Sequence, residues 1–208
     1  MIQNSLLQSD PRTRPIPMDI RQPRGARLHE RRALLIALFT VYLVLLNWVV
    51  LWKLELPYVG ASGVRPVKLV PFVSADGFAA NSPLEVGVNV LLFVPFGIYL
   101  ALLVPHWRRP QSTAVFAVSS LGFELTQFVL AVGSFDTTDL IANTAGGLIG
   151  LAAASAAIRR SGAPAVRSLT RWCVIGTCIA VLIAGAFVTS PLHFNRVDAG
   201  RLSGQSPR

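Results

Sequence analysis

The chain has 208 residues, of which 52% are hydrophobic and only 14% are charged, and its mean hydropathy is +0.54. These values exclude an ordinary soluble domain, which is less apolar and carries more charge. A net charge of +9 would suggest a nucleic-acid partner in a soluble protein, but here the basic residues lie in the polar segments around apolar runs, so we expect no nucleic-acid binding.

Five apolar stretches approach the roughly 20 residues that a helix needs to cross about 30 Å of hydrocarbon. They are Ala33–Trp52, Val86–Val104, Ser112–Val132, Asp139–Ile158 and Trp172–Val188. The sequence therefore predicts an all-α bundle of five transmembrane helices over residues 33–188, in the cell membrane. Residues 1–32 contain too few large apolar side chains to form a core, so we expect a disordered basic tail there. Residues 189–208 are expected to be a polar C-terminal tail.

The basic residues alternate between the two sides of the predicted bundle. Thirteen of the 19 Lys and Arg fall before the first span, between the second and third spans, and between the fourth and fifth. The other six fall in the first loop and after the fifth span. Cytoplasmic segments carry the excess of Lys and Arg in membrane proteins, which places the N-terminus in the cytoplasm and the C-terminus outside.

The first loop contains an apolar segment, VKLVPFVSADGF, at residues 67–78. It is too short to cross the membrane, so we expect it to lie in the outer interface or to dip over the bundle. Lys68 and Arg65 would then be the cations nearest to polar groups in the outer half of the spans.

The third span carries a narrow polar stripe. Ser120, Glu124 and Gln127 fall within about 60° of one another on a helix, so this stripe should face protein and not lipid. Insertion scales put an ionisable residue at the centre of a span at roughly 2.5–3.5 kcal/mol, so Glu124 is expected to have polar partners or a function. The expected partners are Gln127, Asn143, Asn89 and Lys68.

The fourth span has a face of polar and small residues. Asp139, Asn143, Gly146 and Gly150 lie on it, and a Gly-xxx-Gly spacing lets two membrane helices approach closely. By depth, the polar residues of the second, third and fourth spans all belong to the outer half of the bilayer, which predicts a shared polar pocket open to the outside. The candidate functional cluster comprises Asn89, Glu124, Gln127, Asp136, Asp139 and Asn143, with Lys68 as a candidate cation.

Several of these residues also allow a purely structural interpretation. Ser82 followed by Glu85 matches a capping box, and the segment Asp136–Asp139 also places carboxylates at a helix N-terminus. Asn89 and Asn143 could simply bridge helices by hydrogen bonds. For the two aspartates, the sequence leaves capping and a site role equally open.

No catalytic residue or cofactor can be assigned from the sequence. The chain lacks a GxSxG motif, a Walker loop and a dinucleotide fingerprint. All three histidines lie outside the predicted spans, and the two cysteines, Cys173 and Cys178, do not have a metal-binding spacing. We therefore expect no metal and no other cofactor.

Four motifs occur in the order in which VanZ-like proteins carry them. KLVPF begins at Lys68, NVLLFVPFG lies in the second span, SLGFELTQ in the third, and DTTDLIANTAGGLIG leads into the fourth and ends at Gly150. Over this region the chain resembles the VanZ-like family of small bacterial membrane proteins, named for a teicoplanin-resistance determinant. The resemblance implies an integral protein of the cell envelope, with no reaction securely attached to the family. By position it also implies that the family's characteristic polar residues are Asn89, Glu124, Gln127, Asp136, Asp139 and Asn143.

Three functions remain open from the sequence. The first is binding of an amphiphile or lipid-linked molecule, such as a lipoglycopeptide, in the outer-leaflet pocket, with membrane lipids as partners and a link to glycopeptide sensitivity. The second is an intramembrane enzyme acting on a lipid or lipid-linked substrate, with Glu124 and Asp136 or Asp139 as acid, base or ligands of Mg²⁺ or Ca²⁺. The absence of an evident activated nucleophile argues against it. The third is a small proton-coupled transporter, because buried carboxylates mark such paths.

Overall fold

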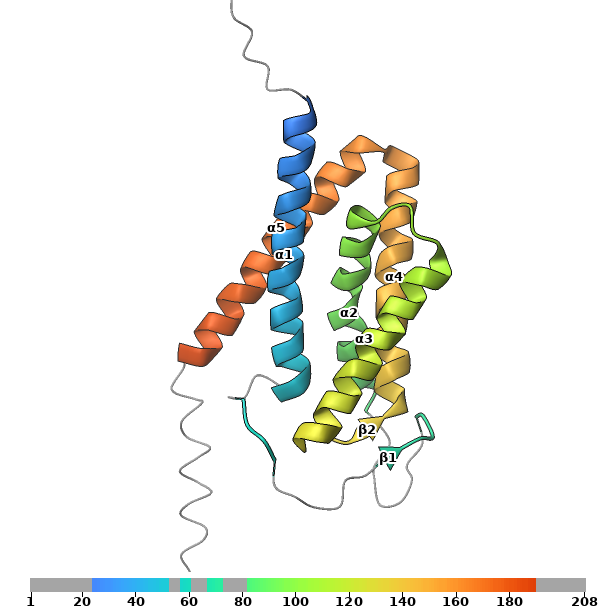
Figure 1. Ribbon diagram of the computed structural model, residues 1–208, viewed down its shortest axis with the longest axis vertical. Coiled ribbons are helices and arrows are strands. Elements are labelled where there is room, and N and C mark those ends of the chain that lie inside the picture. Colours follow the sequence, from blue (N-terminus) through green and yellow to red (C-terminus); the bar gives the residue numbers. More distant parts are fainter. Residues whose placement is uncertain (1–23, 53–56, 61–66, 73–81, 190–208) are drawn as a thin grey trace, which may run out of the picture.

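The computed structural model describes residues 24–52, 57–60, 67–72 and 82–189 as a bundle of five long helices (Figure 1). The elements, in chain order, are α1 (Arg24–Trp52), β1 (Val67–Lys68), α2 (Pro83–Leu103), α3 (Arg109–Leu130), β2 (Phe135–Asp136), α4 (Thr137–Ser161) and α5 (Ala163–Thr189). All five helices are long and apolar enough to cross a membrane, which confirms the predicted all-α fold with five candidate spans among the described residues. Successive helices run in alternating directions, and α5 crosses obliquely beside α1 (Figure 1).

All five helices begin before the predicted spans, and two of them begin nine residues earlier. Helix α1 starts at Arg24 and not at Ala33, and α5 starts at Ala163 and not at Trp172. Hydropathy marks only the part of a helix that lies in hydrocarbon, whereas the backbone hydrogen bonds continue into the polar zone beyond it. The expectations for residues 1–23 and 190–208, and for Arg65, lie outside the described residues.

The junction between α4 and α5 is a single residue, Gly162. Its φ of 57° is in the left-handed region that glycine tolerates best, and its N–H still bonds to the Ile158 carbonyl. Pro164 then sits in the first turn of α5, where its missing N–H would have no helical partner. The basic segment expected to be a connecting loop is therefore almost entirely helical.

Helices α2 and α4 pack closely enough for their backbones to touch. A Cβ atom added at Gly146 would lie 2.1 Å from the Val90 carbonyl oxygen, and one at Gly150 would lie 2.0 Å from that of Val94. The predicted face of small residues on α4 therefore does form a close helix contact, and the helix that it contacts is α2. We call this contact the glycine seam.

The apolar core lies between the helices, and the outer surface is also apolar. Phe93 and Phe116 are completely buried, and Phe96 stacks edge-on against Phe116. On the outside, Val118 and Leu182 are 68% and 71% exposed. Such exposure suits contact with lipid tails, because a water-soluble bundle would place polar residues there.

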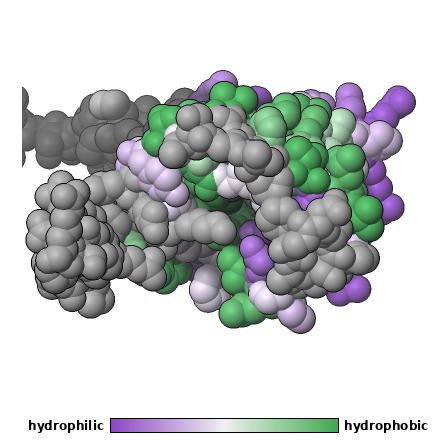
Figure 2. Space-filling model, turned by 90° about the horizontal axis from the view of Figure 1, so that it is seen from below, coloured by the Kyte–Doolittle hydropathy of each residue, from purple (hydrophilic) through white to green (hydrophobic). Residues whose placement is uncertain are grey.

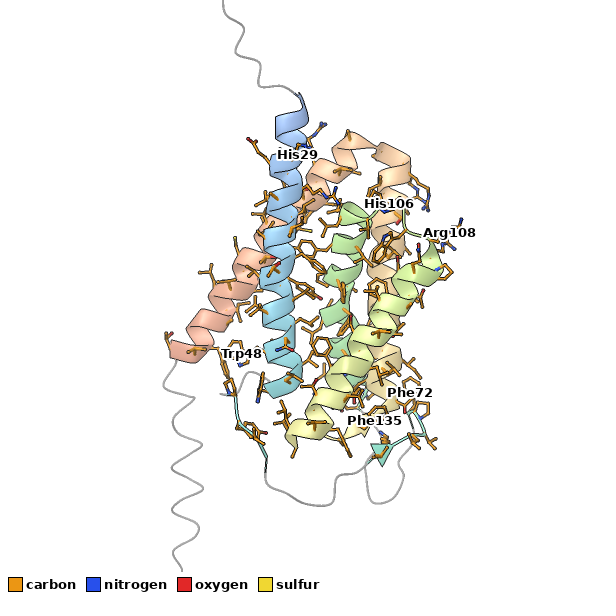
Figure 3. All side chains as sticks on the ribbon, viewed as in Figure 1. His29, Trp48, Phe72, His106, Arg108 and Phe135 are labelled. Carbon is orange, nitrogen blue, oxygen red and sulfur yellow. The ribbon has the colours of Figure 1, made fainter. Side chains whose placement is uncertain are left out.

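Two short strands fasten the first loop to the end of the bundle. Val67 and Lys68 pair in parallel with Phe135 and Asp136 in the turn between α3 and α4. In Figure 3, Phe72 and Phe135 mark this end of the bundle, whereas His29 and His106 lie at the opposite end. The described part of the first loop therefore contacts the start of α4, and residues 73–78 of the predicted segment lie outside the described residues.

Candidate functional site

The predicted polar residues surround one cavity. It lies where α1 ends, α2 begins, α3 ends and α4 begins, and its volume is about 510 Å³. All six residues of the candidate cluster line it: Asn89, Glu124, Gln127, Asp136, Asp139 and Asn143. Side chains separated by up to 54 positions in the sequence thus share one site, which we call the polar pocket. Figure 2 shows this end of the molecule, where hydrophilic residues lie beside hydrophobic ones near the centre of the face.

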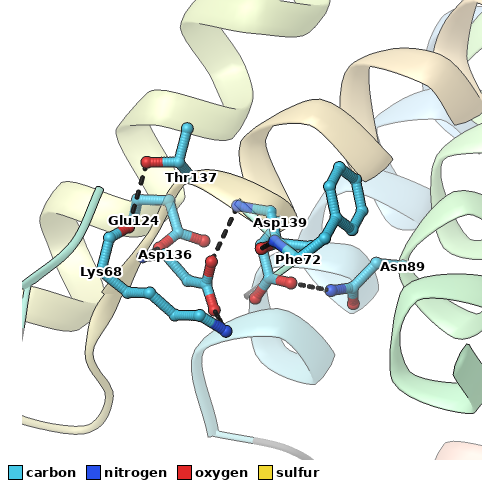
Figure 4. A network of polar contacts seen from close by, with 8 residues as sticks. Lys68, Phe72, Asn89, Glu124, Asp136, Thr137 and Asp139 are labelled. Atoms are coloured by element: carbon cyan, nitrogen blue, oxygen red, sulfur yellow. Dashed lines mark hydrogen bonds and ion pairs between the residues drawn. The ribbon is translucent and has the colours of Figure 1, made fainter. Parts of the chain in front are cut away.

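Glu124 lies at the bottom of the polar pocket with a backbone partner. Its side chain is only 1% exposed, and its Oε2 atom accepts a hydrogen bond of 2.7 Å from the Asp136 backbone N–H (Figure 4). Ala131 makes this contact geometrically accessible, because its left-handed backbone (φ 56°) ends α3 and turns the chain back along it. The predicted protein-facing orientation of Glu124 is confirmed.

The expected side-chain partners of Glu124 have partners of their own. Among the described residues no hydrogen bond joins Glu124 to Asn89, Gln127 or Asn143. Asn89 Nδ2 donates instead to Asp139 Oδ1 across 2.6 Å, which joins α2 to α4. That part of the expectation was wrong, because the turn after α3 brings a main-chain donor closer than any of these side chains.

Gln127 and Asn143 each connect two helices. Gln127 Nε2 donates to the Val50 carbonyl oxygen across 2.7 Å, which ties α3 to the end of α1. Asn143 Nδ2 donates to Ser120 Oγ across 3.0 Å, which ties α4 to α3. Both side chains are buried, so the third-span stripe and the fourth-span face meet as predicted.

Asp136 combines the two roles that the sequence left open. Its Oδ1 atom accepts a hydrogen bond of 2.7 Å from the Thr138 N–H, which makes it the N-cap of α4. Its Oδ2 atom lies 3.4 Å from Lys68 Nζ, and its backbone N–H donates the hydrogen bond to Glu124. Capping and site architecture therefore share one residue.

Lys68 is buried beneath the first loop, with 7% of its surface exposed. The pairing of β1 with β2 places it opposite Asp136, and its own carbonyl accepts a hydrogen bond from the Thr137 hydroxyl across 3.0 Å. Farther along the loop, the Phe72 N–H donates to Thr138 Oγ1. Lys68 does not line the cavity itself, but it neutralises a carboxylate that does (Figure 4).

One buried polar atom lacks a partner. Among the residues that the structure describes, Asn143 Oδ1 accepts no hydrogen bond, although Asn143 is only 2% exposed and lines the polar pocket. Leaving a buried acceptor unpaired lowers the free energy of unfolding by about 1–3 kcal/mol, so unpaired acceptors are rare in folded proteins. A donor group supplied by a ligand would satisfy it.

Three residues, Glu85, Thr137 and Thr138, have roles at this end of the bundle that the sequence did not predict. Ser82 Oγ caps α2 by accepting from the Glu85 N–H, as expected, but the Glu85 side chain also lines the polar pocket. Thr137 and Thr138 bind the first loop, a role that the local pattern did not suggest because it depends on a segment 66 to 69 residues away.

The pocket end of the bundle is acidic. Of the residues described there, Glu85, Glu124, Asp136 and Asp139 carry carboxyl groups and Lys68 is basic. Within the described part of the chain, no three His, Cys, Asp or Glu side chains are grouped as ligands of a metal ion. The pocket thus favours a ligand that donates hydrogen bonds or carries positive charge.

Comparison with known proteins identifies the family. Residues 39–158 match the VanZ/LLP1 family; they contain α2 and α3, most of α4 and the second half of α1. Protein VanZ from Enterococcus faecium is 37% identical over 116 residues, or 55% of this chain and 69% of that protein. No solved structure matches the chain. The matched region includes every residue of the polar pocket, and the chain belongs to the VanZ/LLP1 family of multi-pass membrane proteins.

Proposed function

We propose that this protein binds the head group of an amphiphilic or lipid-linked molecule in the polar pocket. The cavity of about 510 Å³ is within the range of small-molecule sites. Its wall combines the polar cluster with apolar side chains from α1 and α2, including Val49, Val88 and Leu92. A polar head beside an apolar chain fits such a mixed wall better than a wholly polar solute does.

The observation that carries the proposal is the unpaired Oδ1 atom of Asn143. The atom is an acceptor, and the neighbouring carboxylates are acceptors too, so the head group should present N–H or O–H donors. Hydroxyl groups, amides and ammonium groups all meet this requirement. A head group that offers only acceptor oxygens does not.

The distribution of charge supports an outer-leaflet position. The pocket end is acidic among the described residues, while the opposite end carries Arg108, Arg109, Arg159 and Arg160. Under the positive-inside rule the basic end is cytoplasmic, so the polar pocket opens toward the outer leaflet. The resemblance to VanZ-like proteins extends the proposal to an effect on sensitivity to teicoplanin-type glycopeptides, through the same pocket.

Mass spectrometry of molecules that co-purify with the protein tests this function. The wild type should retain a molecule with donor groups in its head, and Asn143→Leu, which keeps the branched arrangement of four side-chain heavy atoms but removes the amide, should retain at least about tenfold less of it. Thr144→Val is the matched control, because Thr144 bonds only to Leu140 within α4 and does not line the cavity. Equal retention by all three proteins would show that the pocket does not hold the molecule.

A further inference from the structure

A second cavity, of about 550 Å³, lies at the opposite end of the bundle from the polar pocket. It is bounded by the end of α2, the connection to α3, the first turn of α3 and the second half of α4. His106 and Arg108 in Figure 3 mark the connection beside it. None of its lining residues belongs to the polar pocket, so we call it the basic cavity.

Two arginines from different helices line the basic cavity. Arg109 is the first residue of α3, and Arg159 lies in the last turn of α4. Neither forms an ion pair within the described part of the chain. Glu30, the sole acidic residue described at this end, is on α1, which does not line the cavity.

The remaining wall of the cavity favours an anion attached to a hydrocarbon chain. The buried residue Ser112 contributes a hydroxyl group near the N-terminus of α3, where the helix dipole also favours negative charge. Beyond these polar groups the wall is apolar, with Leu148 and Leu151 from α4. Trp107, which is 38% exposed, lines the rim as tryptophan does at membrane interfaces.

We propose that the basic cavity holds the phosphate head group of an anionic phospholipid from the adjacent leaflet, between Arg109 and Arg159, with its acyl chain against the apolar wall. Basic cavities between transmembrane helices are suited to such head groups. Arginine can hold phosphate oxygens with two parallel hydrogen bonds, which gives geometry as well as charge. A free phosphate ion would leave the leucine wall in contact with water.

Lipid binding to the full-length protein in detergent tests this proposal. Native mass spectrometry can measure the Kd for phosphatidylglycerol, with phosphatidylcholine as the uncharged reference. The double variant Arg109→Gln/Arg159→Gln should raise the Kd for phosphatidylglycerol by about tenfold or more, because each basic residue contributes about 1 kcal/mol near a lipid surface. Binding of phosphatidylcholine should not change.

The matched control removes the same charge from the same end. Arg160 and Arg167 do not line the cavity, so Arg160→Gln/Arg167→Gln should leave the Kd within about threefold of the wild type. Equal losses in both double variants would mean diffuse surface attraction, and no loss in the first would mean no site; either result overturns the proposal. Displacement of phosphatidylglycerol by millimolar inorganic phosphate would also overturn it, in favour of a soluble anion.

A second pair of variants tests the cavity without changing charge. Ala152 lines the basic cavity and is exposed, whereas its exposed neighbour Ala153 does not line it. Ala152→Phe should fill the space and weaken phosphatidylglycerol binding by a similar factor, and Ala153→Phe should not. Undiminished binding by Ala152→Phe would place the lipid elsewhere.

Discussion

The backbone N–H of Asp136 and the carboxylate of Glu124 are joined by a 2.7 Å hydrogen bond that connects the start of α4 to the inside of α3. Because the donor is a main-chain group, it cannot be lost by changing the Asp136 side chain. The acceptor belongs to a side chain, so its contribution can be measured by substitution at position 124.

We expect Glu124→Ala to lower the free energy of unfolding by about 1–3 kcal/mol, because it removes the carboxylate that accepts the hydrogen bond of the buried Asp136 N–H. Glu124→Gln keeps an acceptor oxygen at the same place and should unfold close to the wild type. Thermal unfolding in detergent measures both. Thr126→Ala serves as control, because Thr126 is only half-buried and its hydroxyl bonds within α3, to the Gly122 carbonyl. Equal stability of Glu124→Ala and Glu124→Gln would mean that the hydrogen bond contributes nothing.

Glu124→Gln should abolish any effect of the protein on teicoplanin sensitivity while leaving membrane insertion unchanged. The substitution preserves the shape of the residue but alters its charge and adds donors in a pocket of acceptors. The minimal inhibitory concentration in cells that express each variant at equal level provides the measurement. Thr126→Ala should behave as the wild type. Unaltered sensitivity with Glu124→Gln would argue strongly against a functional carboxylate at this position.

Lys68 and Asp136 should be strongly coupled in a double-mutant cycle. Lys68→Met leaves a buried carboxylate without its cation, and loss of one partner of a buried pair costs about 3–5 kcal/mol. Adding Asp136→Asn should recover much of that loss, since asparagine is also a good N-cap. Unfolding free energies of the two single variants and the double variant give the coupling energy. Simple additivity would show that the pair does not matter energetically.

Gly146→Ala should destabilise the bundle by about 1–3 kcal/mol, as overpacking does in a filled interior. The added methyl group would meet the Val90 carbonyl of α2 at 2.1 Å, and a main-chain atom cannot move aside alone. The matched control is Gly122→Ala, because a Cβ atom there has no neighbour within 4 Å and alanine favours a helix. Size-exclusion profiles and thermal unfolding should separate the two variants. A Gly146→Ala protein as stable as Gly122→Ala would contradict the close approach of α2 and α4.

Cysteine labelling in intact cells should show which end of the bundle faces the outside of the cell. In a background with Cys173 and Cys178 replaced by alanine, Tyr58→Cys lies at the pocket end and His106→Cys at the opposite end, and both positions are exposed. A membrane-impermeant maleimide should label position 58 from outside and reach position 106 only after lysis. The reverse pattern would place the polar pocket on the cytoplasmic side.

The five spans and the position of the pocket could be predicted because both depend on local patterns. Hydropathy identifies segments that prefer hydrocarbon, and the helical period places Ser120, Glu124 and Gln127 on one face whatever the tertiary structure. The Gly146 and Gly150 spacing likewise predicted a close contact between helices. What it could not predict was the partner, since several helices could have met that face.

The partners of the polar residues could not be predicted because they depend on the irregular segments. The contact of Lys68 with Asp136 rests on two strands of two residues each, which are too short for any alternating pattern. The hydrogen bond from Asp136 to Glu124 depends on the left-handed backbone conformation of Ala131, which an alanine in the sequence does not predict. The depth of the side chains in the spans therefore suggested partners for Glu124 that form hydrogen bonds with other residues.

The glycine seam limits how the polar pocket can adapt to molecules of different size. With the backbones of α2 and α4 in contact, these two helices form one stiff wall that cannot open independently. The opposing wall is held to its neighbour by the hydrogen bond from Gln127 to the Val50 carbonyl. Differences in head-group size would then be accommodated on the side that is joined by this side-chain bond and not by touching backbones, so homologues that admit bulkier head groups should differ around α1 and the end of α3 while keeping their glycines.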